Sequence, residues 1–346
     1  MLTNACNFAC AYCRQPHGDK SLDSSEVEQA IEFFWPFFAE ECHINFYGGE
    51  PLLEFDKIRK AVQFIEKKNR DSPNQFHYSL STNGFLLNDE RLEFLNRKKF
   101  SVLLSFDGYA QEKARQRGSF SKCVSIIEKF VQYQDIHLKT NSVFLPETVK
   151  YFSESISFIV ELGVPNIRFS FDCTSDWLKS DCMQLRLEFE KLRRFSIEYS
   201  KIKETLPINF WSKDYSDGMF YCAAGKDRIA LAPDGILWGC HAFPAYFDQS
   251  RDPETFEKFS FGHLSFFTSQ HDEIYSKKVA NYSPLVMDNF YSCEGPCILC
   301  DNIFECRVCP VYAAYTSKKI GKIPTAVCVI NKIMQKEKER FWKELL

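Results

Sequence analysis

The chain has 346 residues and a formal net charge of -3 at pH 7, a length that suits one large domain with a smaller one appended. Lys and Arg are spread along the sequence, which excludes a basic stripe for nucleic acid and a polybasic membrane anchor. No apolar run approaches the roughly 18 residues of a membrane span, and the N-terminus lacks a signal-peptide pattern, so we expect a cytoplasmic protein with neither nucleic acid nor membrane as partner.

From residue 20 to about 172, amphipathic helical stretches alternate with short strand-like runs, a pattern typical of a parallel α/β sheet. Residues 1–5 would be the stump of a first strand. Further strands are predicted at His43 to Tyr47, Phe76 to Ser81, Ser101 to Phe106, Leu138 to Val143 and Asn166 to Phe171. Helices are predicted to begin near Ser24, Asp56, Asn88, Ser119 and Glu147. These units predict an α/β fold, a partial (β/α)6 TIM-like barrel with its chemistry on the loops after the strands.

Polar, glycine-rich segments follow three of these strands: Gly48-Gly49-Glu50-Pro51, Ser81-Thr82-Asn83-Gly84 and Ser105-Phe106-Asp107-Gly108. Because the carboxyl ends of parallel strands meet at one edge, the three segments are expected to lie together.

A charged helical stretch is predicted from Met183 to Glu204. It is followed by Pro207, after which the amino-acid composition changes. We therefore expect two domains, residues 1–210 and 211–346. The second has short strands and turns, such as Ala232-Pro233-Asp234-Gly235, with little continuous hydrophobic patterning, and we expect it to depend on metal for its fold. An amphipathic helix from Val327 to Leu346 should pack against the body of the protein.

Fifteen cysteines favour metal ligation over disulfides in a reducing compartment. Three lie near the start of the chain and eight lie after residue 220. Between these zones lie Cys42, Cys123, Cys173 and Cys182, which we interpret as small buried apolar side chains.

The first zone is Cys6-x3-Cys10-x2-Cys13, with Tyr12 before the last cysteine. Three thiols on one loop suit a [4Fe-4S] cluster with one iron left open. A structural zinc site would need a fourth ligand, which His17 could supply.

This motif resembles the hallmark of the radical S-adenosylmethionine (SAM) superfamily, with an aromatic residue before the third cysteine. The resemblance implies that SAM chelates the open iron through its amino and carboxylate groups. One-electron cleavage of SAM then gives a 5'-deoxyadenosyl radical that takes a hydrogen atom from the substrate, and Cys6, Cys10 and Cys13 are the catalytic cluster ligands.

The family resemblance extends to the SAM contacts. The Gly48-Gly49-Glu50-Pro51 segment resembles the family motif that binds the methionine amino group. Arg115 or Arg117 could reach the methionine carboxylate and Asn141 the ribose, although a solvated arginine is an equal alternative. The cofactor-binding residues implied are Tyr12, Gly48, Gly49, Glu50, Pro51, Ser81, Asn83, Ser105, Asp107, Arg115 and Asn141.

The later cysteines follow the pattern Cys222-x12-Gly235-x4-Cys240, then Cys297-x2-Cys300-x5-Cys306-x2-Cys309 and Cys328. This pattern resembles the SPASM domain, an iron–sulfur extension of radical SAM enzymes that modify peptides and proteins. It implies two auxiliary [4Fe-4S] clusters, one on Cys222, Cys240 and Cys309, the other on Cys297, Cys300, Cys306 and Cys328.

Two departures from the SPASM pattern leave ligation open. The last pair is spaced by two residues where the family usually has three, and Cys293 is additional. Cys293 could complete the first auxiliary cluster, that cluster could keep an open iron for substrate, or Cys293 could be a free thiol. A zinc ribbon is the alternative for the whole region.

The resemblance leaves the reaction open between two oxidoreductase subfamilies. Maturases of ribosomally made peptides install thioether or carbon–carbon cross-links, and an auxiliary cluster would accept the second electron. Anaerobic sulfatase maturases form formylglycine and typically carry an aspartate after the second auxiliary cysteine, where this chain has His241. We favour the peptide maturase; a non-catalytic iron–sulfur electron-transfer protein is the alternative of another class.

The expected partners are a peptide or protein substrate and an electron donor such as flavodoxin or ferredoxin. Leader binding would use a separate leader-binding protein, the region between Cys240 and Cys293, or exposed barrel surface. The cysteine motif starts at residue 6, which leaves no room before it for a leader-binding domain. A start codon placed too far downstream is the alternative explanation for the clipped first strand.

Overall fold

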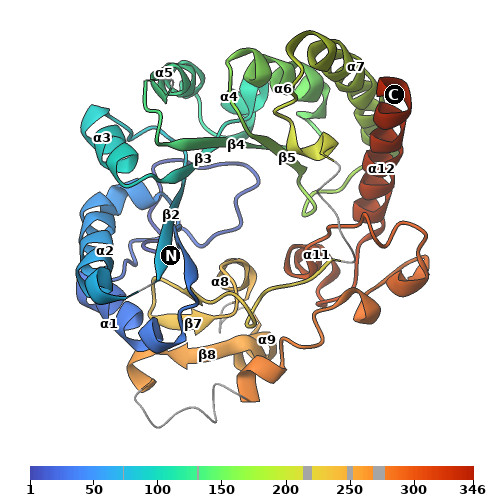
Figure 1. Cartoon of the computed structure of the whole chain (residues 1–346). Helices are drawn as coiled ribbons and strands as arrows, with labels where there is room; N and C mark the ends of the chain where they lie inside the picture. Colours follow the sequence, from blue (N-terminus) through green and yellow to red (C-terminus); the bar gives the residue numbers. More distant parts are fainter. Residues whose placement is uncertain (73, 131, 213–219, 248–251, 268–276) are drawn as a thin grey trace.

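A five-stranded parallel sheet in the order β1-β2-β3-β4-β5 forms the centre of the computed structural model, which describes all residues except 73, 131, 213–219, 248–251 and 268–276. The helices lie outside the curved sheet (Figure 1), as in a partial (β/α) barrel. The strands are β1 (Glu41–Phe46), β2 (Gln75–Thr82), β3 (Ser101–Ser105), β4 (His137–Phe144) and β5 (Ile167–Phe171). The helices are α1 (Ser24–Phe34), α2 (Phe55–Lys68), α3 (Asp89–Arg97), α4 (Gln111–Ala114), α5 (Phe120–Phe130), α6 (Phe152–Glu161) and α7 (Lys179–Lys203).

The predicted first-strand stump is a short hydrogen-bonded segment beside the end of β1. The Leu2 amide donates to the Tyr47 carbonyl over 2.8 Å, and the Gly49 amide donates to the Thr3 carbonyl over 2.7 Å. Residues 2–5 thus extend the sheet beyond β1 and lead directly into the cysteine loop.

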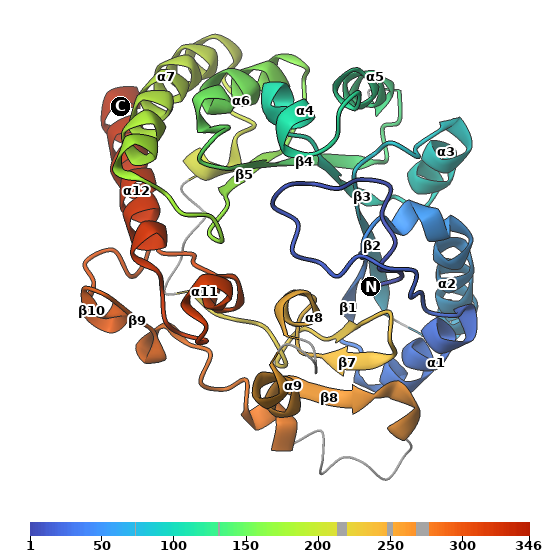
Figure 2. The ribbon, with the colours of Figure 1, turned by 180° about the vertical axis from the view of Figure 1, so that it is seen from behind.

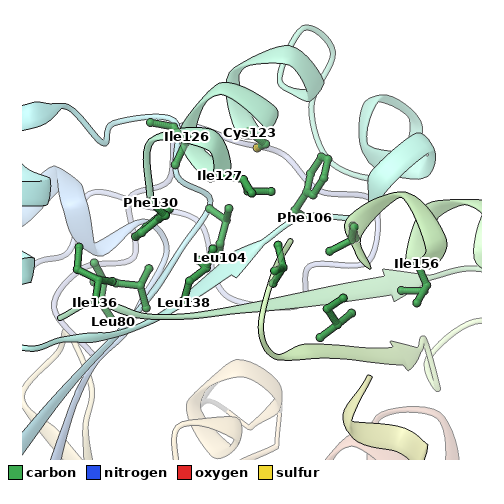
Figure 3. Packing of buried hydrophobic residues seen from close by; sticks show 14 of the residues in the cluster. Leu80, Leu104, Phe106, Cys123, Ile126, Ile127, Phe130, Ile136, Leu138 and Ile156 are labelled. Carbon is green, nitrogen blue, oxygen red and sulfur yellow. The ribbon is translucent and has the colours of Figure 1, made fainter. Parts of the chain in front are cut away.

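Alternating side chains give the sheet one face buried under helices and one inner face. On β4 the buried positions include Leu138 and Phe144, whereas Lys139 and Asn141 are only half-buried. Figure 3 shows Leu138 packed with Leu80 and Leu104 beneath α5. The apolar residues of each strand therefore fix which residues face the barrel interior.

Most predicted helix starts agree with the structure within one residue, and α6 is the exception. The Asn88 side chain caps α3 by accepting from the Arg91 amide over 3.0 Å, as its position predicted. Near Glu147, the Thr148 hydroxyl accepts from the Leu145 amide in a turn. A 3-10 helix, Val149–Tyr151, follows this turn, and α6 itself begins at Phe152.

The second region closes the open side of the sheet (Figure 2). Its strands are β6 (Ala230–Leu231), β7 (Ile236–Trp238), β8 (Ser260–His263), β9 (Tyr291–Ser292) and β10 (Gly295–Pro296). Its helices are α8 (Ala242–Tyr246), α9 (Pro253–Phe259), α11 (Pro310–Ser317) and α12 (Thr325–Leu345). Despite its weak hydrophobic patterning, this region has an aromatic core in which Tyr282 contacts Phe243, Phe259 and Phe261.

The last helix packs against the barrel, as its amphipathic pattern predicted. Ile330, Ile333 and Phe341 of α12 are buried in the same core cluster as the sheet. The Arg193 guanidinium of α7 and the Glu337 carboxylate of α12 form a buried ion pair of 3.2 Å. Among the described residues, no helix has the length and apolar character required to cross a membrane.

Candidate active site

The loop with Cys6, Cys10 and Cys13 lies beyond the carboxyl end of β1, and all three thiols are half-buried. A backbone hydrogen bond of 3.0 Å from Cys13 to Cys10 tightens the loop, and the Ala11 amide donates to the Ala114 carbonyl. Burial raises the pKa of Cys10 to about 11; Arg115 lowers it, and the charges of Cys13 and Cys6 raise it. The three thiols therefore lie close enough to interact electrostatically.

Two glycines hold this loop against the segment that follows β1. Besides the Gly49 contact with Thr3, the Glu50 amide donates to the Ala5 carbonyl over 2.8 Å. A Cβ atom on Gly48, whose φ is +145°, would lie 2.5 Å from the Thr3 oxygen, and one on Gly49 would lie 2.2 Å from the Ala5 oxygen. Both glycines are thus required for the close approach of one backbone to another.

The Glu50 carboxylate is buried and joins two loops. It accepts from the Thr82 hydroxyl over 2.8 Å, from the Asn83 amide over 2.8 Å and from the Leu52 amide over 3.0 Å. Burial raises the pKa of Glu50, and these hydrogen bonds oppose the rise. A carboxylate has about four acceptor positions, so one remains for a donor such as an ammonium group. Pro51 follows as the first residue of a 3-10 turn, in which Pro51 and Leu52 are buried.

The Asn83 side chain extends this connection to the cysteine loop. Its Nδ2 atom donates to Asn7 Oδ1 over 2.8 Å, next to Cys6. Asn7 carries no motif signal in the sequence, and only its position beside Cys6 could have indicated a role.

Asp107 and Arg115 are bound to each other. Arg115 donates from Nε and from Nη2 to the two carboxylate oxygens, each over 2.8 Å. Asp107 also accepts from the Val143 amide over 2.8 Å and from the Tyr12 hydroxyl over 3.3 Å. The Arg115 guanidinium lies 5.2 Å from the centre of the Tyr12 ring. The structure therefore joins three expected SAM contacts in one buried network, whereas the alternative Arg117 is exposed.

The other expected contacts lie on the inner face of the sheet. Ser81 is half-buried on β2, and Ser105 of β3 is paired in register with Asn141 of β4. Asn141 is in turn paired with Arg168 of β5, which is exposed on the same face. Ser105, Asn141 and Arg168 thus form one row across three strands. No motif in the sequence indicates a role for Arg168.

The auxiliary cysteines form two groups. Burial raises the pKa of Cys309 to about 11, and the charges of Cys240 and Cys222 add to the rise. These three cysteines therefore lie near one another.

Cys173 packs against the apolar cluster that includes Val308 and Cys297. Burial raises its pKa to about 12, and the charges of Asp172 and Cys309 raise it further.

The second group lines a cavity of about 240 Å³. Cys297, Cys300, Cys306 and Cys328 all contribute to its wall. Cys293 is exposed and lies beside this group: its sulfur accepts from the Thr325 hydroxyl over 3.1 Å, and its charge acts on Cys328.

These thiol groups fit iron–sulfur clusters. Within the described ranges, no three His, Cys, Asp or Glu side chains lie close enough to share one metal ion. A cubane does not need such closeness, because each cysteine binds a different iron atom. The cavity beside the second group is several times the roughly 30 Å³ that one water occupies in the liquid. The raised thiol pKa values mean that metal binding must displace protons.

His241 contacts both Tyr47, beside the Gly48-Gly49 segment, and Cys240 of the first auxiliary group. Its ring centre is 4.6 Å from that of Tyr47, the residue before Gly48, and its Nδ1 is 3.6 Å from the Cys240 sulfur. Burial lowers the pKa of His241 to about 4, and the charge of Arg228 adds to the drop. The imidazole is therefore neutral at pH 7.

Comparison with known proteins gives the following matches. Residues 1–159 match the family model described as the radical SAM superfamily. The chain is 22% identical to the radical SAM cyclopropyl synthase TigE of Paramaledivibacter caminithermalis, over 73% of this chain and 59% of that protein. It is 29% identical to a serine-type anaerobic sulfatase-maturating enzyme of Klebsiella aerogenes, over 68% of this chain and 64% of that enzyme.

A solved structure of native anSMEcpe with bound AdoMet and Kp18Cys peptide has a TM-score of 0.78 and 19% identity, over 99% of this chain and 97% of that chain. The chain thus spans less than two thirds of the length of the two curated relatives. The likeness to the solved structure shows a common fold.

Proposed function

We propose that this chain is a radical SAM enzyme that modifies a ribosomally made peptide. Residues 1–159 match the family model of the radical SAM superfamily, and two matched relatives are named as enzymes. The modification is a thioether or carbon–carbon cross-link, or a related oxidation. The observation that carries this proposal is the contact of Tyr47 with His241, which brings the SAM side of the site to the auxiliary cysteines. A peptide bound alongside this contact would be within reach of both.

Three cysteine sets would hold the iron–sulfur clusters. Cys6, Cys10 and Cys13 would bind the catalytic one; Cys222, Cys240 and Cys309 the first auxiliary one; and Cys297, Cys300, Cys306 and Cys328 the second. When bound, the catalytic cluster and SAM supply a 5'-deoxyadenosyl radical for hydrogen abstraction. The orientation of SAM and the transfer of a proton would be the work of side chains of this chain.

Glu50 would orient the SAM ammonium group. Its carboxylate is held on three sides by Thr82, Asn83 and Leu52, so its remaining acceptor position has a fixed direction. Arg115 is neutralised by Asp107, so its role would be to position Tyr12 beside the cysteine loop. Arg168 is in register with Asn141 and has no ion-pair partner among the described residues. It would offer a free cation to a carboxylate of SAM or peptide.

His241 would be the base. A neutral buried imidazole can accept the proton that leaves when a substrate radical is oxidised. Its position directly after Cys240 puts it beside the first auxiliary cysteines.

The second candidate is formylglycine formation on a sulfatase. Relatives named as serine-type and cysteine-type anaerobic sulfatase-maturating enzymes favour it. The base at position 241 distinguishes the two candidates, since the sequence has histidine where those enzymes typically have aspartate.

Several further features belong to the same proposal. We place the radical SAM unit in residues 1–210 and the auxiliary unit in residues 211–346. The enzyme would act in the cytoplasm with a flavodoxin or ferredoxin as electron donor and a separate protein for leader binding.

The first experiment tests the radical chemistry. Anaerobically reconstituted enzyme with SAM and dithionite should form 5'-deoxyadenosine. Protein that contains its full iron and sulfide yet forms none would contradict the proposal.

The second experiment distinguishes the reactions. A short peptide encoded beside this gene is coexpressed with the enzyme and analysed by mass spectrometry. A cross-link removes two hydrogens and leaves no group that reacts with a hydrazide, whereas formylglycine carries an aldehyde that does react. A hydrazide adduct on a sulfatase peptide, with the neighbouring peptide unchanged, would favour the second candidate.

A further inference from the structure

The first auxiliary set has three cysteines, and a cubane that is closed by protein needs a fourth ligand. All fifteen cysteines lie in the described part of the chain and none is in a disulfide. The fourth ligand can therefore be searched for among the cysteines that the three sets do not use: Cys42, Cys123, Cys173, Cys182 and Cys293.

Four of these five cysteines lie elsewhere. Cys42 and Cys123 are buried on β1 and α5 in the main core, and Figure 3 shows Cys123 packed beneath its helix. Cys182 packs against the same core from α7. Cys293 lies with Cys328 in the second auxiliary group.

Cys173 is in a different environment. It lies two residues after β5, at the carboxyl end of the sheet where the other site loops lie. Its side chain is half-buried and packs against an apolar cluster of the second region. That cluster includes Val308 and Ala313, which lie on either side of Cys309 in the sequence, and also Cys297 of the second auxiliary group. The Cys173 thiol is also within electrostatic reach of the Cys309 thiol.

The turn that carries Cys173 is fixed on both sides. On its own side, the Asp172 carboxylate accepts from the Thr174 amide over 3.0 Å, and the Trp177 indole donates to the Asp172 carbonyl over 2.8 Å. On the other side, the Thr316 hydroxyl of α11 donates to the Cys173 carbonyl over 3.2 Å. Cys309 is the N-cap residue at the other end of that same helix, and its side chain makes no capping hydrogen bond.

The turn also contacts the catalytic cysteine loop. Arg14, next to Cys13, donates from Nε to the Thr174 hydroxyl over 3.1 Å and lies 5.0 Å from the Tyr315 ring of α11. The position of Cys173 is therefore set by contacts to both cysteine regions.

We propose that Cys173, from the barrel loop after β5, is the fourth ligand of the first auxiliary cluster, together with Cys222, Cys240 and Cys309. This inference rests on the auxiliary clusters of the proposed function. It implies that this cluster has no vacant iron for a substrate thiol. The peptide would then be held by protein groups, and the cluster would carry electrons only.

The test uses full-length protein with Cys6, Cys10 and Cys13 all changed to Ala, reconstituted anaerobically, so that only auxiliary clusters contribute. Mild oxidation converts a cluster with an unligated iron to a [3Fe-4S] form with a characteristic EPR signal. We expect no such signal in this background and a clear one after Cys173→Ala. Cys182→Ala is the matched control and should add none.

A second variant distinguishes loss of a cluster ligand from misfolding. Cys173→Ser keeps the size of the side chain and a weaker ligand atom, so the EPR g values of one reduced auxiliary cluster should shift while the iron content stays the same. Cys182→Ser should leave the spectrum unchanged.

The outcomes separate this inference from the function on which it rests. A spectrum unchanged by both Cys173 variants overturns the inference, as does a [3Fe-4S] signal produced by Cys293→Ala instead. A background protein that binds zinc in place of iron and sulfide overturns the inference and the auxiliary clusters together, while 5'-deoxyadenosine formation by the unmodified chain would still support the radical chemistry.

Discussion

The Asp107 carboxylate and the Arg115 guanidinium are joined by two hydrogen bonds of 2.8 Å, and the side chains are 0% and 6% exposed. The pair links the loop after β3 to Tyr12 in the cysteine loop. Residues that resemble ligand contacts in the sequence therefore also hold the site together.

Removal of this carboxylate should destabilise the protein. Asp107→Ala leaves Arg115 as a buried charge without a counter-ion, which we expect to lower the free energy of unfolding by about 3 to 5 kcal/mol. Chemical denaturation of the variant measures the loss. Arg117→Ala removes an exposed cation two residues from Arg115 and should change stability by less than about 0.5 kcal/mol. Equal effects of the two variants would contradict the role of the pair.

A methyl group at Gly49 should displace the cysteine loop. In Gly49→Ala the new Cβ would meet the Ala5 oxygen at 2.2 Å, and a displacement of about 1 Å costs roughly 100-fold in rate. We expect 5'-deoxyadenosine formation to fall by about this factor while the auxiliary clusters persist. Gly18→Ala is the control, because nothing lies within 4 Å of that Cβ position. Normal SAM cleavage by Gly49→Ala would show that the loop contact is not required.

Loss of one ligand of the proposed catalytic cluster should leave the proposed auxiliary clusters in place. Cys10→Ala should abolish SAM cleavage and remove about one third of the iron, if three clusters of equal size are present. Iron analysis and absorbance near the sulfur-to-iron charge-transfer bands measure the remainder. Cys42→Ala, which changes a buried core cysteine, should keep both iron and activity. Complete loss of iron from Cys10→Ala would contradict separate clusters.

The assignment of the base can be tested once a peptide substrate is known. His241→Gln should reduce formation of the modified peptide by about 100-fold or more and leave 5'-deoxyadenosine formation intact, because hydrogen abstraction does not need the base. High-performance liquid chromatography of both products from one reaction gives the ratio. His263→Gln, on β8, is the control. If His241→Gln lowers both products equally, His241 acts on SAM binding or on folding instead.

Local patterns in the sequence predicted most of the barrel. Alternation of apolar side chains, as in Leu138 and Phe144, gave all five sheet strands within two residues of their observed bounds. The helix after Thr148 was predicted too early, because a hydroxyl-to-backbone turn competes with the helix there. The aromatic core around Tyr282 was not foreseen, since its rings come from short segments without a common period.

Most of the candidate site residues belong to short motifs at the carboxyl ends of strands, and their roles stay predictions. The pairings among them could not be predicted from these motifs. The sequence indicates a SAM contact for Arg115 but not its ion pair with Asp107. For Cys173, the place just after β5 is the only sequence signal of the proposed ligand role.

The sequence by itself was enough to predict the radical SAM resemblance, the strand alternation and the cysteine motifs, because backbone periodicity and ligand spacing are properties of neighbouring residues. Only the tertiary structure decided that Asp107 neutralises Arg115, that His241 meets Tyr47, and that Cys173 lies beside Cys309. These contacts join residues that are far apart in the chain or separated by a turn. Their partners are selected by how the sheet, its loops and the second region pack in space, which no local pattern encodes.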